Sequence, residues 1–173
     1  MEQIANTYIA ELCGYLKCLS RLSANNYVFG ASAYEANCEI DDLITAVFEK
    51  LGKGDKYIES SECEYLGREI IEPQDIVSEI ESYIFAGLLE REQMPNDKAR
   101  IYATRMLSED INEYYGLVST SQNKDGEFHP LLSGEVYRLN IRNTKYSREF
   151  YFIKKIESLY VLTYFLQKEA HEA

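Results

Sequence analysis

The chain has 173 residues and a formal net charge of −11, from 29 acidic and 18 basic side chains. This length suits one domain, and 46% apolar residues supply the material for a core, which excludes a disordered chain. So large a negative charge also excludes nucleic-acid binding through the overall electrostatic field, because phosphates would be repelled.

Two helices are expected in the first 65 residues. Apolar residues recur at three- and four-residue spacing between Ile4 and Leu22, which predicts an amphipathic helix there. A second helix is predicted over residues 32–51. The stripe of the first helix could mediate a homodimer, or the helix could cover the rest of the chain. Its residues are Tyr8, Leu12, Leu16 and Leu19.

From residue 66 the pattern changes. A short strand is expected at 67–71, followed by helices at 74–90 and from Asp97 to about Leu117. Alternating, β-branched and aromatic runs at 136–142, 148–153 and 159–165 then predict three strands with short connections, which favour antiparallel pairing.

The predicted fold class is therefore α+β, with a helical N-terminal region followed by a β-α-α-β-β-β unit that forms an antiparallel sheet. Two parts are expected along the chain. Residues 1–65 would form an acidic helical extension, and residues 66–173 an α+β domain.

The N-terminus lacks the basic and apolar regions of a secretory signal, and no apolar run approaches the ~20 residues needed to cross a bilayer. A cytoplasmic protein with no membrane contact is expected. The four cysteines include no CxxC pair and have no neighbouring histidine, which argues against a zinc site. We expect no metal or other cofactor.

The C-terminal third resembles the RelE/HigB (phage Gp49-like) toxin superfamily. The residues that carry the resemblance are EVYRLNIR at 135–142, REFYF at 148–152 and LYVLTYFLQK at 159–168. The resemblance covers roughly residues 66–173 and is clearest over 131–169. It implies a RelE-like fold and metal-independent cleavage of mRNA on the ribosome, in which basic side chains stabilise the charge on the phosphate.

Matched residue by residue, the resemblance implies a catalytic set of Arg142, Arg148 and Tyr164, the tyrosine standing where many members carry a histidine. A set that contacts RNA would contain Arg138, Lys145, Lys154 and Lys168. The expected partners are then mRNA and the ribosome, bound through the C-terminal sheet, and an antitoxin. The chain departs from the family's pattern at Asn140 and Glu169, and it is larger and more acidic than its members.

An alternative reading starts from the acidic residues. They form a dense band, made up of Glu59, Glu62, Glu64, Glu69, Glu72, Asp75, Glu79 and Glu81. Such a band is typical of a non-catalytic binding protein (an immunity protein, antitoxin or anti-defence inhibitor) that sequesters a basic nuclease or nucleic-acid-binding partner. It is equally typical of a solvated face that keeps a protein soluble.

Overall fold

The computed structural model describes residues 2–50, 63–90, 97–115, 135–143 and 145–169. Its elements in chain order are α1 (Glu2–Leu22), β1 (Tyr27–Glu35), α2 (Ile40–Thr45), the π-helical turn η1 (Ala46–Lys50), β2 (Cys63–Ile70), α3 (Pro73–Glu90), α4 (Asp97–Tyr115), β3 (Val136–Asn143), β4 (Tyr146–Ile156) and β5 (Leu159–Lys168). The predicted α+β class is confirmed, as is the β-α-α-β-β-β order from β2 onward.

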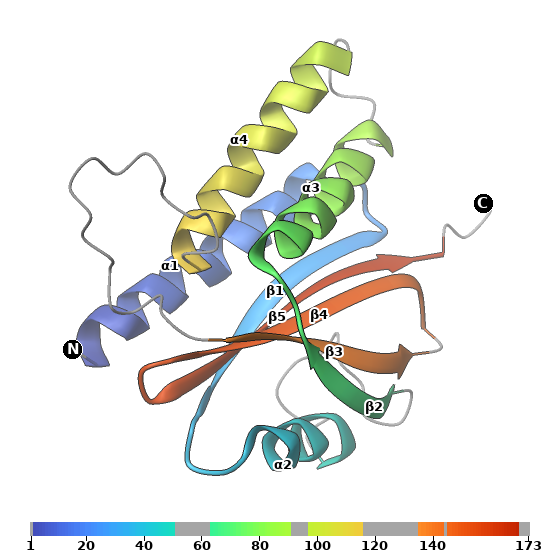
Figure 1. Ribbon diagram of the computed structural model, residues 1–173. Coiled ribbons are helices and arrows are strands. Elements are labelled where there is room, and N and C mark those ends of the chain that lie inside the picture. Colours follow the sequence, from blue (N-terminus) through green and yellow to red (C-terminus); the bar gives the residue numbers. More distant parts are fainter. Residues whose placement is uncertain (1, 51–62, 91–96, 116–134, 144, 170–173) are drawn as a thin grey trace.

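The strands form one five-stranded sheet in the order β1-β5-β4-β3-β2, and every neighbouring pair is antiparallel. The three consecutive C-terminal strands occupy its centre, joined by short connections. The two strands from the first half of the sequence, β1 and β2, lie at its two edges (Figure 1).

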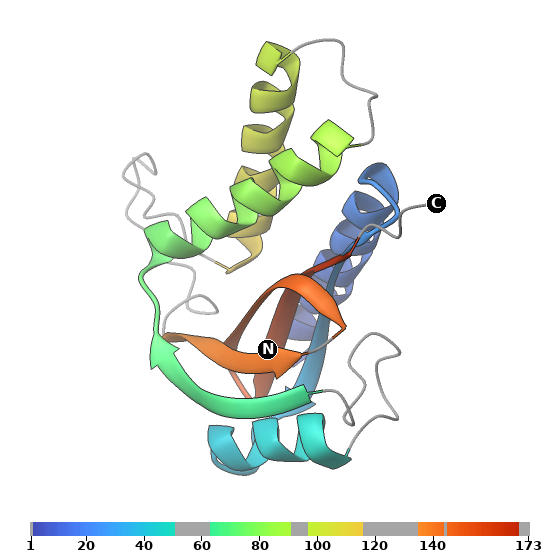
Figure 2. The same cartoon turned by 90° about the vertical axis from the view of Figure 1, so that its right-hand side faces the viewer.

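Helices cover both faces of the sheet, as the two views show (Figures 1 and 2). On one face, α1, α3 and α4 enclose the larger core, which includes Leu16, Ile80 and Phe165. On the other face, the short α2 and η1 enclose a second core around Phe48 and Tyr151. Residues that alternate along a strand therefore enter different cores.

Three of the four residues in the predicted stripe of α1 are buried within the chain itself. Leu12, Leu16 and Leu19 are at most 3% exposed and pack in the larger core. These three leucines thus cover the chain's own core, and the side chain of Tyr8, the fourth residue of the predicted stripe, lies outside the described residues.

The second predicted helix is shorter than expected, because residues 32–35 continue β1 and the helix begins only at Ile40. β1 pairs with β5 over nine residue positions, from Tyr27 opposite Gln167 to Glu35 opposite Leu159. The hydrogen bonds of this long-range strand pairing outweigh the helical preference of residues 32–35.

The division expected between residues 65 and 66 falls inside β2. Residues on both sides of it contribute strands to the same sheet and side chains to the same two cores. The four cysteines, all in the described part of the chain, form no disulfide.

Candidate functional site

A β-bulge in the edge strand β2 builds a polar cluster of Asp41, Tyr65, Arg68 and Tyr137, which we call the β2 cluster. Tyr65 lies opposite Ile141 and Arg68 lies opposite Leu139, and the register shifts between Tyr65 and Gly67. Without the extra residue, side chains three positions apart would point to opposite faces. With it, Tyr65 and Arg68 both point towards α2. Gly67 takes φ 131°, a conformation that glycine adopts without steric cost.

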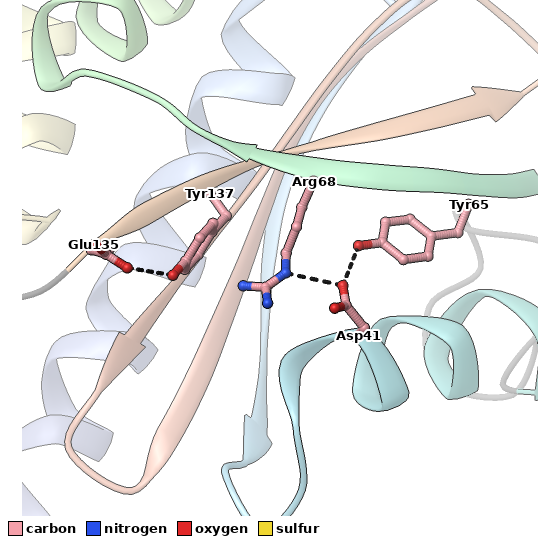
Figure 3. Close-up of polar contacts among 5 residues, drawn as sticks. All are labelled: Asp41, Tyr65, Arg68, Glu135 and Tyr137. Atoms are coloured by element: carbon pink, nitrogen blue, oxygen red, sulfur yellow. Dashed lines mark hydrogen bonds and ion pairs between the residues drawn. The ribbon is translucent and has the colours of Figure 1, made fainter.

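Both side chains bind one carboxylate of α2 (Figure 3). The Tyr65 hydroxyl donates to Asp41 Oδ1 at 2.7 Å, and Arg68 Nε donates to the same oxygen at 3.0 Å. The Arg68 guanidinium also lies over the Tyr137 ring, 4.4 Å from its centroid, and the Tyr137 hydroxyl donates to Glu135. These contacts tie α2, β2 and β3 together.

In the folded state, the pKa values of the four side chains in this cluster are shifted further from pH 7. The hydrogen bond from Tyr65 is the main cause that lowers the pKa of Asp41 below its ordinary 3.8. Burial and then the Asp41 acceptor raise the pKa of Tyr65, and the bond to Glu135 raises that of Tyr137. Burial lowers the pKa of Arg68, but the bond to Asp41 outweighs it and the net shift is upward. These shifts favour the charged form of Asp41 and Arg68 and the neutral form of the two tyrosines at neutral pH.

The cluster borders a hollow of about 570 Å³ on the α2 side of β2, which we call the α2-side hollow. Its wall consists of Asp41, Tyr65, Leu66, Gly67, Arg68, Glu69, Ile70 and Tyr137. Two aliphatic side chains in it are open to solvent, Leu66 with 53% and Ile70 with 59% of its surface exposed.

A second hollow of about 520 Å³ lies between β2 and α3, and we call it the α3-side hollow. Its wall consists of Glu69, Ile70, Ile71, Glu72, Asp75, Ser78, Glu79, Ser82, Arg138 and Arg148. The wall contains four carboxylates and two guanidinium groups, so the hollow has a net negative charge. Both hollows include Glu69 and Ile70, so they flank the same end of β2.

The two edges of the sheet differ in how their backbone is covered. On β1, the Phe29 N–H donates to Ser20 Oγ at 2.6 Å, and Ser20 Oγ donates to the Phe29 carbonyl at 3.1 Å. Cys13 Sγ donates to the Ala31 carbonyl at 3.3 Å. Helix α1 thus closes the β1 edge. Among the residues that the structure describes, no strand pairs with the outer edge of β2.

The structure brings two of the predicted residues together, Arg138 and Arg148, in the wall of the α3-side hollow. Arg148 donates to Ser82 Oγ at 2.5 Å, lies 3.6 Å from a Glu79 oxygen and stacks 4.0 Å from the centroid of Tyr83. These contacts attach β4 to α3. Arg138 lies over Phe150, 5.5 Å from the centroid of its ring.

The other two predicted catalytic residues lie elsewhere. Arg142 is exposed and pairs with Glu64 at 3.1 Å. Tyr164 is buried in the core on the opposite face, the α2 side. It packs on Gly30 across the β1–β5 pair, where an added Cβ would collide with its ring. The sheet therefore separates Tyr164 from Arg148.

The three predicted lysines are also spread over the sheet. Lys154 is 2% exposed on the α1, α3 and α4 side, and burial lowers the pKa of its amine. Lys145 lies half-buried next to the start of β4, and Lys168 ends β5, where its N–H donates to the Asn26 carbonyl at 2.8 Å. Lys154 lies on the same face of the sheet as Arg138 and Arg148, but it is buried, whereas Arg142 is exposed.

The acidic residues of this region are predicted from the sequence, whereas Asp41, Tyr65, Arg68 and Tyr137 are not. The predicted acidic band contains five residues of this region, namely Glu64, Glu69, Glu72, Asp75 and Glu79. Two other members of the band, Glu59 and Glu62, lie outside the described residues. One signal could have pointed to the rest. A glycine inside a strand, such as Gly67, often marks a bulge that redirects its neighbours.

Within the described ranges, no group of three or more His, Cys, Asp or Glu residues is arranged to hold a metal ion. The described helices include none that is both long enough and apolar enough for a membrane crossing.

No protein-family model matches the chain, and no curated protein matches its sequence. Among solved structures, the crystal structure of citrus MAF1 is similar, with a TM-score of 0.46 and 11% sequence identity. The match covers 94% of this chain and 99% of that one.

Proposed function

We propose that this protein is a non-catalytic acidic binding protein that sequesters a basic partner through the region around β2 and the start of α3. The observation that carries the proposal is the net negative charge of the residues that line the two hollows at one end of β2. Fixed negative charge in partly enclosed surfaces attracts and orients a basic partner.

Two further features support binding over catalysis. The resolved pKa shifts in the β2 cluster all move away from neutral pH, whereas a general acid or base works best with a pKa near it. The residues predicted for ribonuclease chemistry lie on both faces of the sheet, with Arg148 against α3 and Tyr164 in the α2-side core.

The proposal is tested by charge reversal. The triple variant Glu69→Lys, Glu72→Lys and Asp75→Lys should stop binding proteins of high isoelectric point that the unmodified chain captures at 0.15 M salt. The matched control is Glu11→Lys, Glu35→Lys and Glu109→Lys, which reverses three exposed carboxylates away from β2. Equal capture by both triple variants would contradict the proposed surface.

The ribonuclease hypothesis is a second candidate, favoured by one observation, that Arg138 and Arg148 share the α3-side hollow. Growth and translation after induction of the full chain test it, beside Arg148→Ala with its folding checked by circular dichroism. Arrest relieved by the substitution would support a RelE/HigB-type toxin and contradict the non-catalytic proposal. A cytoplasmic location belongs to both proposals, and cell fractionation tests it.

A further inference from the structure

The two edges of the sheet differ in the part of the chain that the structure describes. No described strand pairs with the outer edge of β2, whereas α1 donates and accepts hydrogen bonds at the β1 edge. Exposed strand edges present unpaired N–H and C=O groups in a row, which an extended segment of another protein can pair with. The exposed Leu66 and Ile70 on β2 add apolar surface beside this row.

The two hollows lie where the side chains of an added strand would go. Successive side chains of a strand point to opposite faces, about 3.3 Å apart along the chain. The α2-side and α3-side hollows share Glu69 and Ile70 and open on opposite faces of β2. Neighbouring residues of a strand added at this end would therefore enter one hollow each.

The chemistry of the hollows defines the residues that would fit. In the α3-side hollow, Arg148 is already paired with Glu79, and Glu69, Glu72 and Asp75 are exposed. A lysine or arginine is favoured there. In the α2-side hollow, Arg68 is already paired with Asp41, and the open surface is that of Leu66 and Ile70. An aliphatic side chain is favoured there.

Charge also disfavours a second copy of this chain as the occupant. Glu64 and Glu69 are exposed on β2, and charged side chains on an edge strand oppose its pairing with another copy. Each copy also carries a net charge of −11. The same carboxylates attract a basic segment.

From these contacts we propose that β2 binds an extended segment of the partner, with alternating basic and aliphatic residues, as a sixth strand of the sheet. The inference rests on the proposed function and specifies how the same region would hold its partner. Main-chain hydrogen bonds would supply affinity, and the two hollows would read alternate side chains.

The probe for this proposal is a fluorescein-labelled nine-residue peptide of alternating lysine and valine, with binding to the full chain followed by fluorescence anisotropy. A peptide of the same composition with its lysines and valines in two blocks should bind at least tenfold more weakly. N-methylation gives the sharper test, because lysine and valine N–H groups point to opposite edges of the peptide strand. Methylating one set should weaken binding at least tenfold, and methylating the other set should change it less than threefold.

Protein variants locate the site. Ile70→Lys should weaken binding at least tenfold, whereas Ile101→Lys, at a position of similar exposure on α4, should leave it unchanged. Hydrogen exchange should slow in β2 and stay the same in β1 when the peptide binds.

Equal binding by the alternating, block-order and both methylated peptides would overturn strand addition, since charge alone would then explain it. The peptides could fail to bind while charge reversal at Glu69, Glu72 and Asp75 still abolishes capture of the partner. That result would contradict strand addition and support the proposed function. If the reversal also leaves capture unchanged, both proposals are contradicted.

Discussion

The two edges of the sheet meet solvent in different ways. At β1, side chains of α1 bind the backbone of Phe29 and Ala31, and the strand lies against the larger core. At β2, the described residues provide no such cover, and a bulge, acidic side chains and two exposed aliphatic residues take its place. Among the described residues, helix contacts thus satisfy backbone groups at β1, while β2 carries exposed charged side chains, which oppose pairing of an edge strand with another copy.

The largest effect on this comparison is expected from Leu16→Ala. Leu16 is fully buried between α1 and the sheet, so its loss should lower the free energy of unfolding by about 2–5 kcal/mol. Urea denaturation measures the change, and hydrogen exchange should speed up in β1. The matched variant Leu66→Ala on β2 should change stability by less than about 0.5 kcal/mol. Similar losses for both would show that the two edges are equally packed.

Glycine substitutions should distinguish packing at one edge from backbone conformation at the other. Gly30→Ala should cost about 1–3 kcal/mol, because its Cβ would collide with the buried Tyr164. Gly67→Ala should cost about 1–3 kcal/mol for another reason, the left-handed φ of 131° with open space around it.

The two causes can be separated by making both glycine substitutions in a Tyr164→Leu background and measuring thermal or urea unfolding. In that background, Gly30→Ala should lower the free energy of unfolding by less, and the effect of Gly67→Ala should be unaltered. If the cost of Gly30→Ala is the same in both backgrounds, the Gly30–Tyr164 contact is not its cause.

Removing the hydroxyl that closes the β1 edge should have a smaller effect. Ser20→Ala leaves the Phe29 N–H without its bond to Ser20 Oγ, at an expected cost of about 1–2 kcal/mol. Amide exchange of Phe29, measured by nuclear magnetic resonance, should accelerate. Ser78→Ala, at an exposed position on α3, is the control and should have little effect on either quantity. Unchanged exchange at Phe29 would mean that α1 does not protect this edge.

The smallest effect is expected at the β2 cluster. Asp41→Asn removes an ion pair with a well-exposed carboxylate, so the loss at neutral pH should stay below about 1 kcal/mol. Because the folded state lowers the pKa of Asp41, this contribution is present above pH 3.8 and disappears as the pH falls through the lowered value.

The stability difference between the unmodified chain and Asp41→Asn should therefore shrink towards zero in acid. Asp42→Asn, on the same short helix, is the control. A difference that persists at pH 2 would place the effect of Asp41→Asn outside its ionisation.

The sequence predicted most elements whose pattern is local. The apolar spacing of α1 and the alternation along β3 to β5 are set by residues close together in the chain, and the structure confirms them. The acidic residues at β2 and α3 were also visible, because charge is read directly from composition. Residues 32–35, the end of β1, were predicted as the beginning of a helix, and the rest of β1 was not predicted. Its pairing with β5 joins residues more than 120 positions apart, which no local pattern reveals.

By itself, then, the sequence determined the α+β class, the order of elements from β2 to β5 and the acidic character of one region. The tertiary structure decided which side chains meet. Alternation fixes faces within a strand, but a shift of one residue reverses them, and β2 and β4 each contain such a shift. The shift in β2 brings Tyr65 and Arg68 to one carboxylate. The register of the central strands places Arg148 and Tyr164 on opposite faces, because register depends on pairing between distant segments.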